Sequence, residues 1–486
     1  MRILIFYIST FILSSSVLGQ SSFYKVFSGL GYDIGEGVAE LEDSSFVVTG
    51  SSTSWEGSSQ VFLMKVDSSG ERQWTQHYGG PEADGASRVL FNKDLGIYAV
   101  GYTNSIGSGD YNGLVVKTDS DGNELWQIGV GEESAWEFFN DAVFARDSSI
   151  LMVGESQDLS DGDKDVYMSR LSRDGDVIWT KKIVAPGLDY ASSIVNIQDS
   201  MFIVGGAFYS EDSLSQKGFI MKMNEDGDIL WKKTLGNKSG AYAIEDVTIS
   251  LDKISAVGSR IVSEDNHDSY LVRYDFDGNI LFESTENDPN AEGSVIMDEI
   301  TYVSSYNRNV MGFRVINAFS FQDTYDCNIA YFNESSLVWL NDFVSINYLG
   351  LDQVNQLMAT SDGGFIGVGQ TTYPISGGGN VFVFKSAPSG TLPNTAEYYT
   401  IDTLVGLDGN LHESNFRVYP NPCVNTIHLD FDGAEEQIVE VYNALGVLVS
   451  SKVLKSGIPY DISFLQPGCY YGKFKQEVFN FIKLKP

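Results

Sequence analysis

The chain has few of the residues that build enzyme centres or disulfide frameworks. Its 486 residues include only 3 Cys and 4 His. No Gly-x-Ser-x-Gly elbow, phosphate-binding loop or Cys/His constellation occurs, and no two histidines have metal-ligand spacing. Three cysteines are too few for a disulfide framework; Cys423 and Cys469 could pair, or both could be small buried residues. An enzyme is therefore less expected than a binding or structural protein.

Basic residues are also scarce. The chain has 31 Lys and Arg against 65 Asp and Glu, a formal net charge of -34. The excess lies before residue 416, because residues 416–486 contain 7 basic and 7 acidic residues. An acidic surface repels phosphate backbones and anionic lipids, so nucleic acid and membrane surfaces are disfavoured as partners. Cations and cationic groups are compatible with this charge.

Long hydrophobic runs are missing except at the start of the chain. Residues 1–19 contain one positive charge, the apolar run Ile3 to Ile8 and small residues near Gly19. This pattern predicts a secretory signal peptide, and the absence of a cysteine behind it argues against a lipid anchor. No other segment has about eighteen unbroken apolar residues, so no transmembrane helix is expected.

A repeat is the most prominent feature that is present. Its period lies in the low fifties, and such periods indicate solenoids or propellers. The segments are short and rich in β-branched and aromatic residues, as in Val61 to Val66, and are typical of strands. Turns such as Asp119 to Asn123 predict hairpins, in which Gly supplies a positive φ. The repeated tryptophans are Trp74, Trp126, Trp179 and Trp231, with a fifth at Trp339.

Four strands in each of seven units predict an all-β fold, a seven-bladed β-propeller of residues 20–392. The last unit lacks a fourth strand after Gly390, whereas Phe23 to Phe27 aligns with that strand. The N-terminal segment is therefore expected to pair with the last blade and to remove its open edge. The tryptophans are interpreted as apolar wedges between blades rather than as ligand contacts.

The loops between second and third strands, and the crossings between blades, are expected on one face, which we call the variable face. Its loops differ from unit to unit, and variable loops on a rigid scaffold are where binding usually occurs. Aromatic residues among these acidic loops would suit a glycan or a protein ligand. The candidates are Trp55, Tyr111, Trp136 and Tyr190.

An acid recurs at the start of the innermost strand, and we call this set the crossing acids. Each could cap backbone N–H groups of its own crossing. Alternatively, the set could surround the mouth of the central channel and hold a cation or a cationic ligand. The crossing acids are Asp33, Asp84, Glu137, Asp189, Glu292 and Asp352.

The loop of residues 158–165 contains four carboxylates in eight residues. Oxygen ligands of this kind suit a hard cation such as calcium, although the spacing is not that of an EF-hand. A solvated acidic loop is the alternative. No other cofactor is predicted. The candidate metal ligands are Asp158, Asp161, Asp163 and Asp165.

Residues 393–415 are rich in Pro, Gly, Asn and Thr and are expected to form a linker. A smaller β unit, residues 416–486, follows with Tyr419-Pro420-Asn421-Pro422, an Asn443-x-x-Gly446 turn and Leu465-x-x-Gly468-x-Tyr470. This tail resembles the C-terminal sorting domain of type IX secretion cargo. The resemblance implies an immunoglobulin-like β-sandwich that the outer-membrane translocon recognises and that a sortase often removes, joining the cargo to a surface lipopolysaccharide.

The repeats themselves resemble secreted bacterial propellers whose units contain a Gly-rich apolar strand, an apolar-Lys-x-Asp strand and an Asp-x-x-Gly turn before Trp. That resemblance implies a fold more than an activity. The expected function is an exported binding module, secreted or held at the outer cell surface of a bacterium, for a glycan or protein ligand. A hydrolase or lyase acting on extracellular polysaccharide and a structural adhesin are the alternatives.

Overall fold

We analysed a computed structural model of the whole chain. It describes residues 22–483 except 30, 56–57, 186, 198–199, 211–212, 236–240, 264–265, 287–292, 304–307, 318–324, 333–351, 373–378, 389–391, 393–396, 401–416, 420–422, 431–436, 444–447, 467 and 475–476. The predicted signal peptide, Glu292 and Trp339 lie outside the described residues. Within the described part of the chain, no helix is long and apolar enough to cross a membrane.

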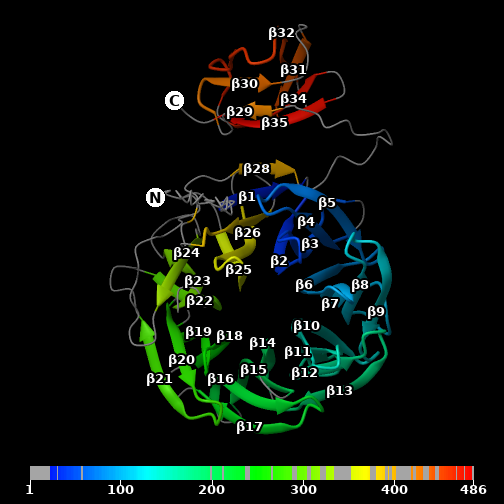
Figure 1. Cartoon of the computed structure of the whole chain (residues 1–486), viewed down its shortest axis with the longest axis vertical. Coiled ribbons are helices and arrows are strands. Elements are labelled where there is room, and N and C mark those ends of the chain that lie inside the picture. Colours follow the sequence, from blue (N-terminus) through cyan, green and yellow to red (C-terminus); the bar gives the residue numbers. More distant parts are fainter. Residues whose placement is uncertain are drawn as a thin grey trace, which may run out of the picture.

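The described propeller strands form a ring of small sheets, antiparallel except for the parallel pair β1 and β28, and this ring is a β-propeller (Figure 1). Five of these sheets consist of four consecutive strands. The first two are β2 (Asp33–Glu40), β3 (Phe46–Ser52), β4 (Gln60–Val66) and β5 (Arg72–Tyr78), then β6 (Asp84–Asn92), β7 (Gly96–Thr103), β8 (Asn112–Thr118) and β9 (Glu124–Val130). The third and fourth are β10 (Ala135–Phe144), β11 (Ile150–Asp158), β12 (Lys164–Leu171) and β13 (Val177–Ile183), then β14 (Tyr190–Ile197), β15 (Met201–Ser210), β16 (Ser213–Asn224) and β17 (Ile229–Thr234). The fifth is β18 (Ala241–Ser250), β19 (Lys253–Ser263), β20 (Asn266–Tyr274) and β21 (Ile280–Glu286).

The remaining two sheets of the ring differ from this plan. One has three described strands, β22 (Gly293–Val303), β23 (Arg308–Asn317) and β24 (Tyr325–Phe332). The other, which we call the closing sheet, has the order β25-β26-β27-β1-β28. Its strands are β25 (Asp352–Ala359), β26 (Phe365–Thr371), β27 (Asn380–Lys385), β1 (Phe23–Ser28) and β28 (Glu397–Thr400).

The expectation of seven blades is therefore wrong. Six blades consist of consecutive strands, and the ring is completed by a sheet that combines both ends of the described propeller. The sixth blade has no described fourth strand, because the Trp339 region lies outside the described residues. The predicted closure is confirmed: β1 pairs antiparallel with β27, with Phe23 opposite Lys385.

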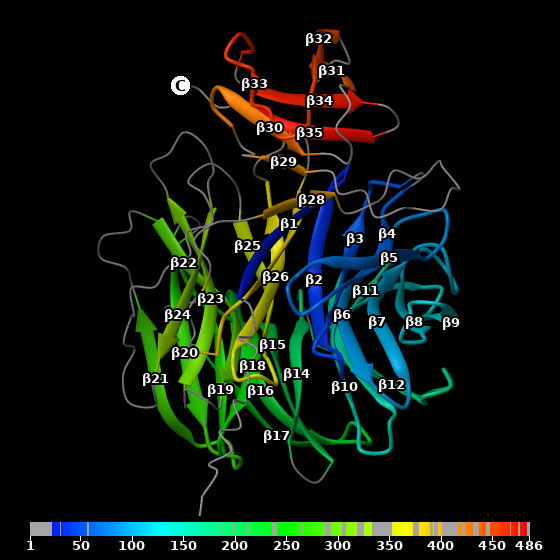
Figure 2. The same ribbon diagram turned by 45° about the horizontal axis from the view of Figure 1, so that its top comes forward.

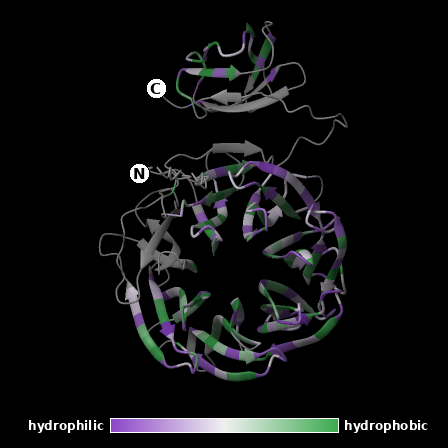
Figure 3. Ribbon diagram, in the orientation of Figure 1, coloured by the Kyte–Doolittle hydropathy of each residue, from purple (hydrophilic) through white to green (hydrophobic). Residues whose placement is uncertain are grey.

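Both faces of a blade are covered by neighbouring blades, so its middle strands are continuously buried. In β4, for example, Val61 to Met64 are all fully buried. Hydrophobic clusters lie between blades; one joins Phe27 of β1 and Phe62 of β4 to Val383 of β27. Figure 3 shows hydrophobic and hydrophilic residues mixed along the strands of the ring. The core is therefore a series of interfaces between sheets rather than one central mass.

The repeated tryptophans lie at these interfaces, as predicted for wedges. A Cβ on Gly122, in the turn of the second blade, would lie 2.9 Å from Cη2 of Trp74 in the first. Gly227 has the same relation to Trp179, also at 2.9 Å. Both glycines have a positive φ, of 82° and 74°. The turn needs Gly for its backbone conformation and for room against the indole ring.

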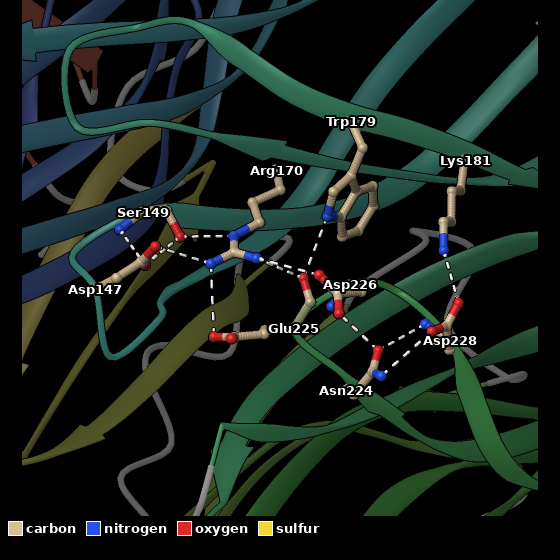
Figure 4. Close-up of polar contacts among 9 residues, drawn as sticks. All are labelled: Asp147, Ser149, Arg170, Trp179, Lys181, Asn224, Glu225, Asp226 and Asp228. Carbon is tan, nitrogen blue, oxygen red and sulfur yellow. Dashed lines mark hydrogen bonds and ion pairs between the residues drawn. The ribbon is translucent and has the colours of Figure 1, made fainter.

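A basic residue on the third strand links successive blades. Arg170 of β12 contacts Asp147 Oδ2 through Nη2 at 2.9 Å and donates through Nη1 to the Glu225 carbonyl of the next blade at 3.0 Å (Figure 4). Lys117 and Lys222 similarly donate to carbonyls of the following blades, at 2.9 and 3.4 Å. The Lys or Arg of the repeat is thus a structural cross-link.

Hydrogen bonds confirm that the second-to-third loops and the crossings share a face. The Asp84 N–H donates to the Ser59 carbonyl at 2.8 Å, and the Asn104 N–H donates to the Ala83 carbonyl at 2.9 Å. Each crossing is thereby joined to loops of the blades on both sides. Figure 2 shows the depth of the ring between its two faces.

The C-terminal region contains two further sheets. One has the order β29-β30-β33 and the other β32-β31-β34-β35. A hydrophobic cluster that includes Cys423, Ile427 and Val441 fills this region. Cys423 is buried and takes no part in a disulfide, so the considered pairing with Cys469 does not form. The strands are β29 (Arg417–Tyr419), β30 (Thr426–Asp430), β31 (Gln437–Asn443), β32 (Leu448–Leu454), β33 (Tyr460–Asp461), β34 (Gly468–Phe474) and β35 (Glu477–Lys483).

Candidate functional site

The first two crossing acids are tied into their own crossings. Asp33 and Asp84 have no exposed surface. The Gly29 N–H donates to Asp33 Oδ2, and the Gly80 N–H donates to Asp84 Oδ2, both at 2.7 Å. A hydroxyl group from the end of the second strand also donates to each carboxylate, Ser52 to Asp33 and Thr103 to Asp84.

Glu137 follows the same plan with a longer side chain. Its Oε2 accepts the Glu132 N–H at 3.3 Å, and its Oε1 lies 3.7 Å from Lys182 Nζ. Burial raises the pKa of the Glu137 carboxyl, although Lys182 opposes this shift. Asp189 is also fully buried, and its N–H donates to the Lys164 carbonyl at 2.8 Å. Asp352 begins β25, and its side chain lies outside the description.

These contacts assign a capping role to Asp33, Asp84 and Glu137. A buried carboxylate that accepts two or more hydrogen bonds satisfies donors that the irregular crossing would otherwise leave unpaired. A cation held at the channel mouth by the crossing acids is not needed to explain their burial and remains a prediction.

The four carboxylates of the acidic loop, residues 158–165, each accept a hydrogen bond from a different backbone N–H group. Asp158 accepts the Ser160 N–H at 2.7 Å, and the Ser160 hydroxyl followed by this N–H lowers the pKa of the Asp158 carboxyl. Asp161 accepts the Asp163 N–H at 3.0 Å. Asp163 and Asp165 reach the next crossing, where they accept the N–H groups of Gly187 and Ala185 at 2.6 and 3.1 Å. Among the residues that the structure describes, no group of three or more His, Cys, Asp or Glu side chains is placed to hold a metal ion. Calcium at this loop therefore remains a prediction from the sequence.

Two of the predicted ligand-binding aromatics lie together. The ring centroids of Tyr111 and Trp136 are 5.5 Å apart, with planes at 75°. Tyr111 and Tyr102 each contact Phe138, at 5.4 and 5.5 Å. Indole Nε1 of Trp136 donates to Asp110 Oδ2 at 3.4 Å. We call Tyr102, Tyr111, Trp136 and Phe138 the aromatic cluster; all four rings are half-buried.

The other two candidates lie apart from the aromatic cluster and from each other. Trp55 stacks on His77, with ring centroids 5.2 Å apart and planes at 23°. The Tyr190 hydroxyl accepts a hydrogen bond from Gln216 at 3.4 Å. Tyr102 and Phe138, by contrast, lie within the strands β7 and β10 and were not predicted as site residues.

A central cavity of about 370 Å³ is lined by residues of all the innermost strands of the ring. Its polar lining residues include Arg88, Asp141, Ser193, Asp246 and Gln356, which we call the polar ring. Each polar ring residue directly follows a β-bulge of its strand. Sequence reasoning placed the channel acids at the strand starts and missed this set. The signal was an extra residue in each innermost strand, which displaces the side chains that follow it.

The polar ring connects neighbouring blades through hydrogen bonds and an ion pair. Asp141 forms an ion pair with Arg88 and accepts the Ile194 N–H of the next blade at 2.8 Å. Asp246 accepts the Ile300 N–H at 2.9 Å, and burial raises its pKa to about 6. Gln356 of the closing sheet accepts the Val38 N–H of the first blade at 2.6 Å. Side chains of one blade thus satisfy donors that the bulge of the next blade leaves open.

Glu36, the bulge residue of β2, is a carboxyl with an altered titration. Burial raises its pKa from 4.5 to about 8. Between these two pH values the unfolded chain releases the Glu36 proton while the folded chain keeps it. Stability is therefore lost as pH rises from 4.5 through 8, and the loss is complete above pH 8.

We expect Glu36→Gln to remove this loss, because an amide does not titrate. At about 1.4 kcal/mol per pH unit the whole shift would be several kcal/mol. The side chain is partly exposed, so solvent screens it and we expect about 2 kcal/mol at pH 9 and no gain at pH 4.5. Urea unfolding at both pH values measures the difference. The exposed residue Glu133 supplies the control, Glu133→Gln; equal gains for Glu36→Gln at the two pH values would contradict the assignment.

Comparisons with known proteins bear on the two parts of the chain differently. The solved structures similar to this chain include the Neurospora crassa Pan2 WD40 domain (15% identity, 74% of this chain and 90% of that chain covered, TM-score 0.41). Others are Sqt1 from Chaetomium thermophilum (12%, 77% and 87%, 0.40) and prolyl oligopeptidase B from Galerina marginata (11%, 69% and 46%, 0.39). These TM-scores lie below 0.5, so the likenesses carry no functional argument. No curated protein matches the chain significantly.

The tail gives the informative match. Residues 417–483 match the family model described as a secretion system C-terminal sorting domain. Such a tail implies interaction with the type IX secretion machinery, secretion and attachment at the cell surface. The chain is therefore a β-propeller that carries a type IX secretion C-terminal sorting domain at its end.

Proposed function

We propose that this chain is an exported binding module whose propeller recognises a glycan or protein ligand through the variable face. The proposal rests on the aromatic cluster, where partly exposed rings lie beside Asp110. Rings that retain exposure on a rigid sheet can contact a ligand without first rearranging, which lowers the entropic cost of binding. The crossing acids and the acidic loop would supply the surrounding negative field, with calcium as an additional ligand of that loop.

The proposed organisation follows the sequence. A signal peptide of residues 1–19 directs export, residues 20–392 form the propeller, residues 393–415 the linker and residues 416–486 the sorting domain. The two sheets of the tail form an immunoglobulin-like sandwich that the translocon recognises and a sortase removes.

The proposed function is tested with the mature full-length chain against immobilised polysaccharides and proteins from the cell surface and medium. We expect retention of at least one ligand class and a loss of about tenfold in affinity for Trp136→Ala. The matched control is Trp231→Ala, which removes a half-buried Trp at a blade interface, outside the variable face. Shortened polysaccharide products would instead favour the hydrolase or lyase alternative, and retention that persists in Trp136→Ala would contradict the proposed site.

A further inference from the structure

The aromatic cluster is built so that ring faces, rather than aliphatic side chains, occupy one part of the variable face. Tyr102 comes from the second strand β7 and lies over Gly85 of β6, where a Cβ would be 2.7 Å from the ring atom Cε1. Any larger residue at position 85 would displace this ring. Tyr111 lies between the other three rings, with centroid distances of 5.4 to 6.1 Å. The packing holds the four rings in fixed orientations.

Acidic residues lie beside one side of the aromatic cluster. Asp110 is exposed and bonds to the edge of Trp136. The Gly109 loop packs on the crossing that carries Glu132 and Glu133, because a Cβ on Gly109 would lie 3.2 Å from the Glu133 Cα. Glu132 is paired with Lys182 at 3.3 Å, whereas Glu133 has an exposed side chain. Burial and then neighbouring groups, Tyr111 and Glu36 among them, raise the pKa of the Tyr102 phenol, so the ring stays neutral.

Aromatic faces with nearby carboxylates favour one class of ligand group. The face of an aromatic ring carries negative potential and attracts a cation within about 6 Å of its centroid. An alkylammonium group combines this charge with apolar carbon, which the rings also contact favourably. A neutral sugar would use the ring faces and could donate hydroxyl hydrogen bonds to the carboxylates, but it would gain no charge attraction from them, and an anion would be repelled.

We infer that the aromatic cluster, with Asp110 and Glu133, binds the alkylammonium group of a lysine side chain on a partner protein. This inference rests on the proposed function, since it names the ligand chemistry of the same face. A protein source is favoured by the surface next to Trp136, where the Leu159 N–H of the acidic loop donates to the Ser134 carbonyl at 3.1 Å. Beside the carboxylates of that loop lie the exposed apolar side chains Leu159, Val184 and Leu188, at 46%, 75% and 46% exposure. Such mixtures match the rim and anchors of a polypeptide partner.

The test titrates the mature chain with two short neutral-backbone peptides, one containing a single lysine and one with N-acetyl-lysine at the same place, at physiological salt. Binding is followed by the NMR signal of the Trp136 indole N–H. We expect the lysine peptide to shift this signal and to bind at least tenfold more tightly than the acetylated peptide. A third arm uses a glucosamine oligomer, which presents amines on a polysaccharide.

Variants separate the contributions. Trp136→Phe keeps an aromatic face and should retain most of the binding, whereas Trp136→Ala should lose about tenfold. Asp110→Asn, at an exposed position that should not affect folding, should weaken binding about threefold and reduce its salt dependence. Asp121→Asn, an exposed acid on the opposite turns, is the matched control and should change nothing.

Equal affinity for the lysine and acetyl-lysine peptides, or binding unaffected by both Trp136→Ala and Asp110→Asn, would overturn the inference. Binding of the glucosamine oligomer alone would overturn the protein source. After any of these results, the proposed binding function would still hold if the variable face retained a neutral ligand. Loss of all retention in the immobilised-ligand assay would instead reject that function itself.

Discussion

Phe27→Ala is expected to lower the free energy of unfolding of the propeller by about 3–5 kcal/mol, the range for removing a large buried aromatic side chain. Phe27 is fully buried in β1 and packs in the cluster shared by the closing sheet and the first blade. The variant can still form the backbone pairing of β1 with β27, but it leaves a cavity in the hydrophobic cluster between the closing sheet and the first blade. Unfolding by urea, followed by tryptophan fluorescence, measures the change.

The control for this prediction is Leu125→Ala in β9 of the propeller, where the side chain is 56% exposed. It should cost well under half as much, because less apolar surface leaves water there on folding. A similarly small effect for Phe27→Ala would mean that the N-terminal strand contributes little to closure. The ring would then be held by the remaining interfaces alone.

Asp141→Ala is expected to cost a similar amount, about 3–5 kcal/mol, for an electrostatic reason. The side chain of Asp141 is 3% exposed and forms an ion pair with Arg88, itself 13% exposed. It also accepts the N–H groups of Ala142 and Ile194, at 2.7 and 2.8 Å. Alanine at position 141 would leave the largely buried guanidinium of Arg88 without this carboxylate. It would also leave two buried N–H donors without their acceptor.

Two further variants make the Asp141 prediction specific. Asp141→Asn keeps one acceptor without the charge and should cost an intermediate amount. Asp121→Ala removes an exposed aspartate and should stay within about 0.5 kcal/mol of the wild type. Urea unfolding at neutral pH compares all three. Equal stability of Asp141→Ala and Asp121→Ala would show that the polar ring does not hold the blades together.

The strands and turns of the propeller could be predicted because the sequence of each repeat specifies them locally. The turn glycines, the alternation of strand and turn, and the matching tryptophans are local signals, and they recur with one period. Closure by Phe23 to Phe27 was also predictable, since a missing strand at one end matched a spare strand at the other. The sorting tail was recognisable from its motifs, and the family match to residues 417–483 bears this out.

The site was less predictable, because bulges change which side chains reach the channel. The acids at the strand starts were visible in the sequence, yet Asp33 and Asp84 are buried and serve their own crossings. Asp141 and Asp246 carry no distinctive local motif and acquire their positions from an extra residue in the strand. The aromatic cluster is similar: Tyr111 and Trp136 were predicted separately, and only the fold adds Tyr102 and Phe138.

The sequence by itself determined the all-β class, the repeat, the closure and the sorting tail, because turns, strand patterns and motifs act over a few residues. Only the tertiary structure decided which polar side chains are consumed by the scaffold and which remain available. Hydrogen bonds between blades join residues about fifty positions apart, as Asp141 and Ile194 show. Which residues form these hydrogen bonds depends on how the sheets pack around the central axis, and the sequence of a single repeat does not specify that packing.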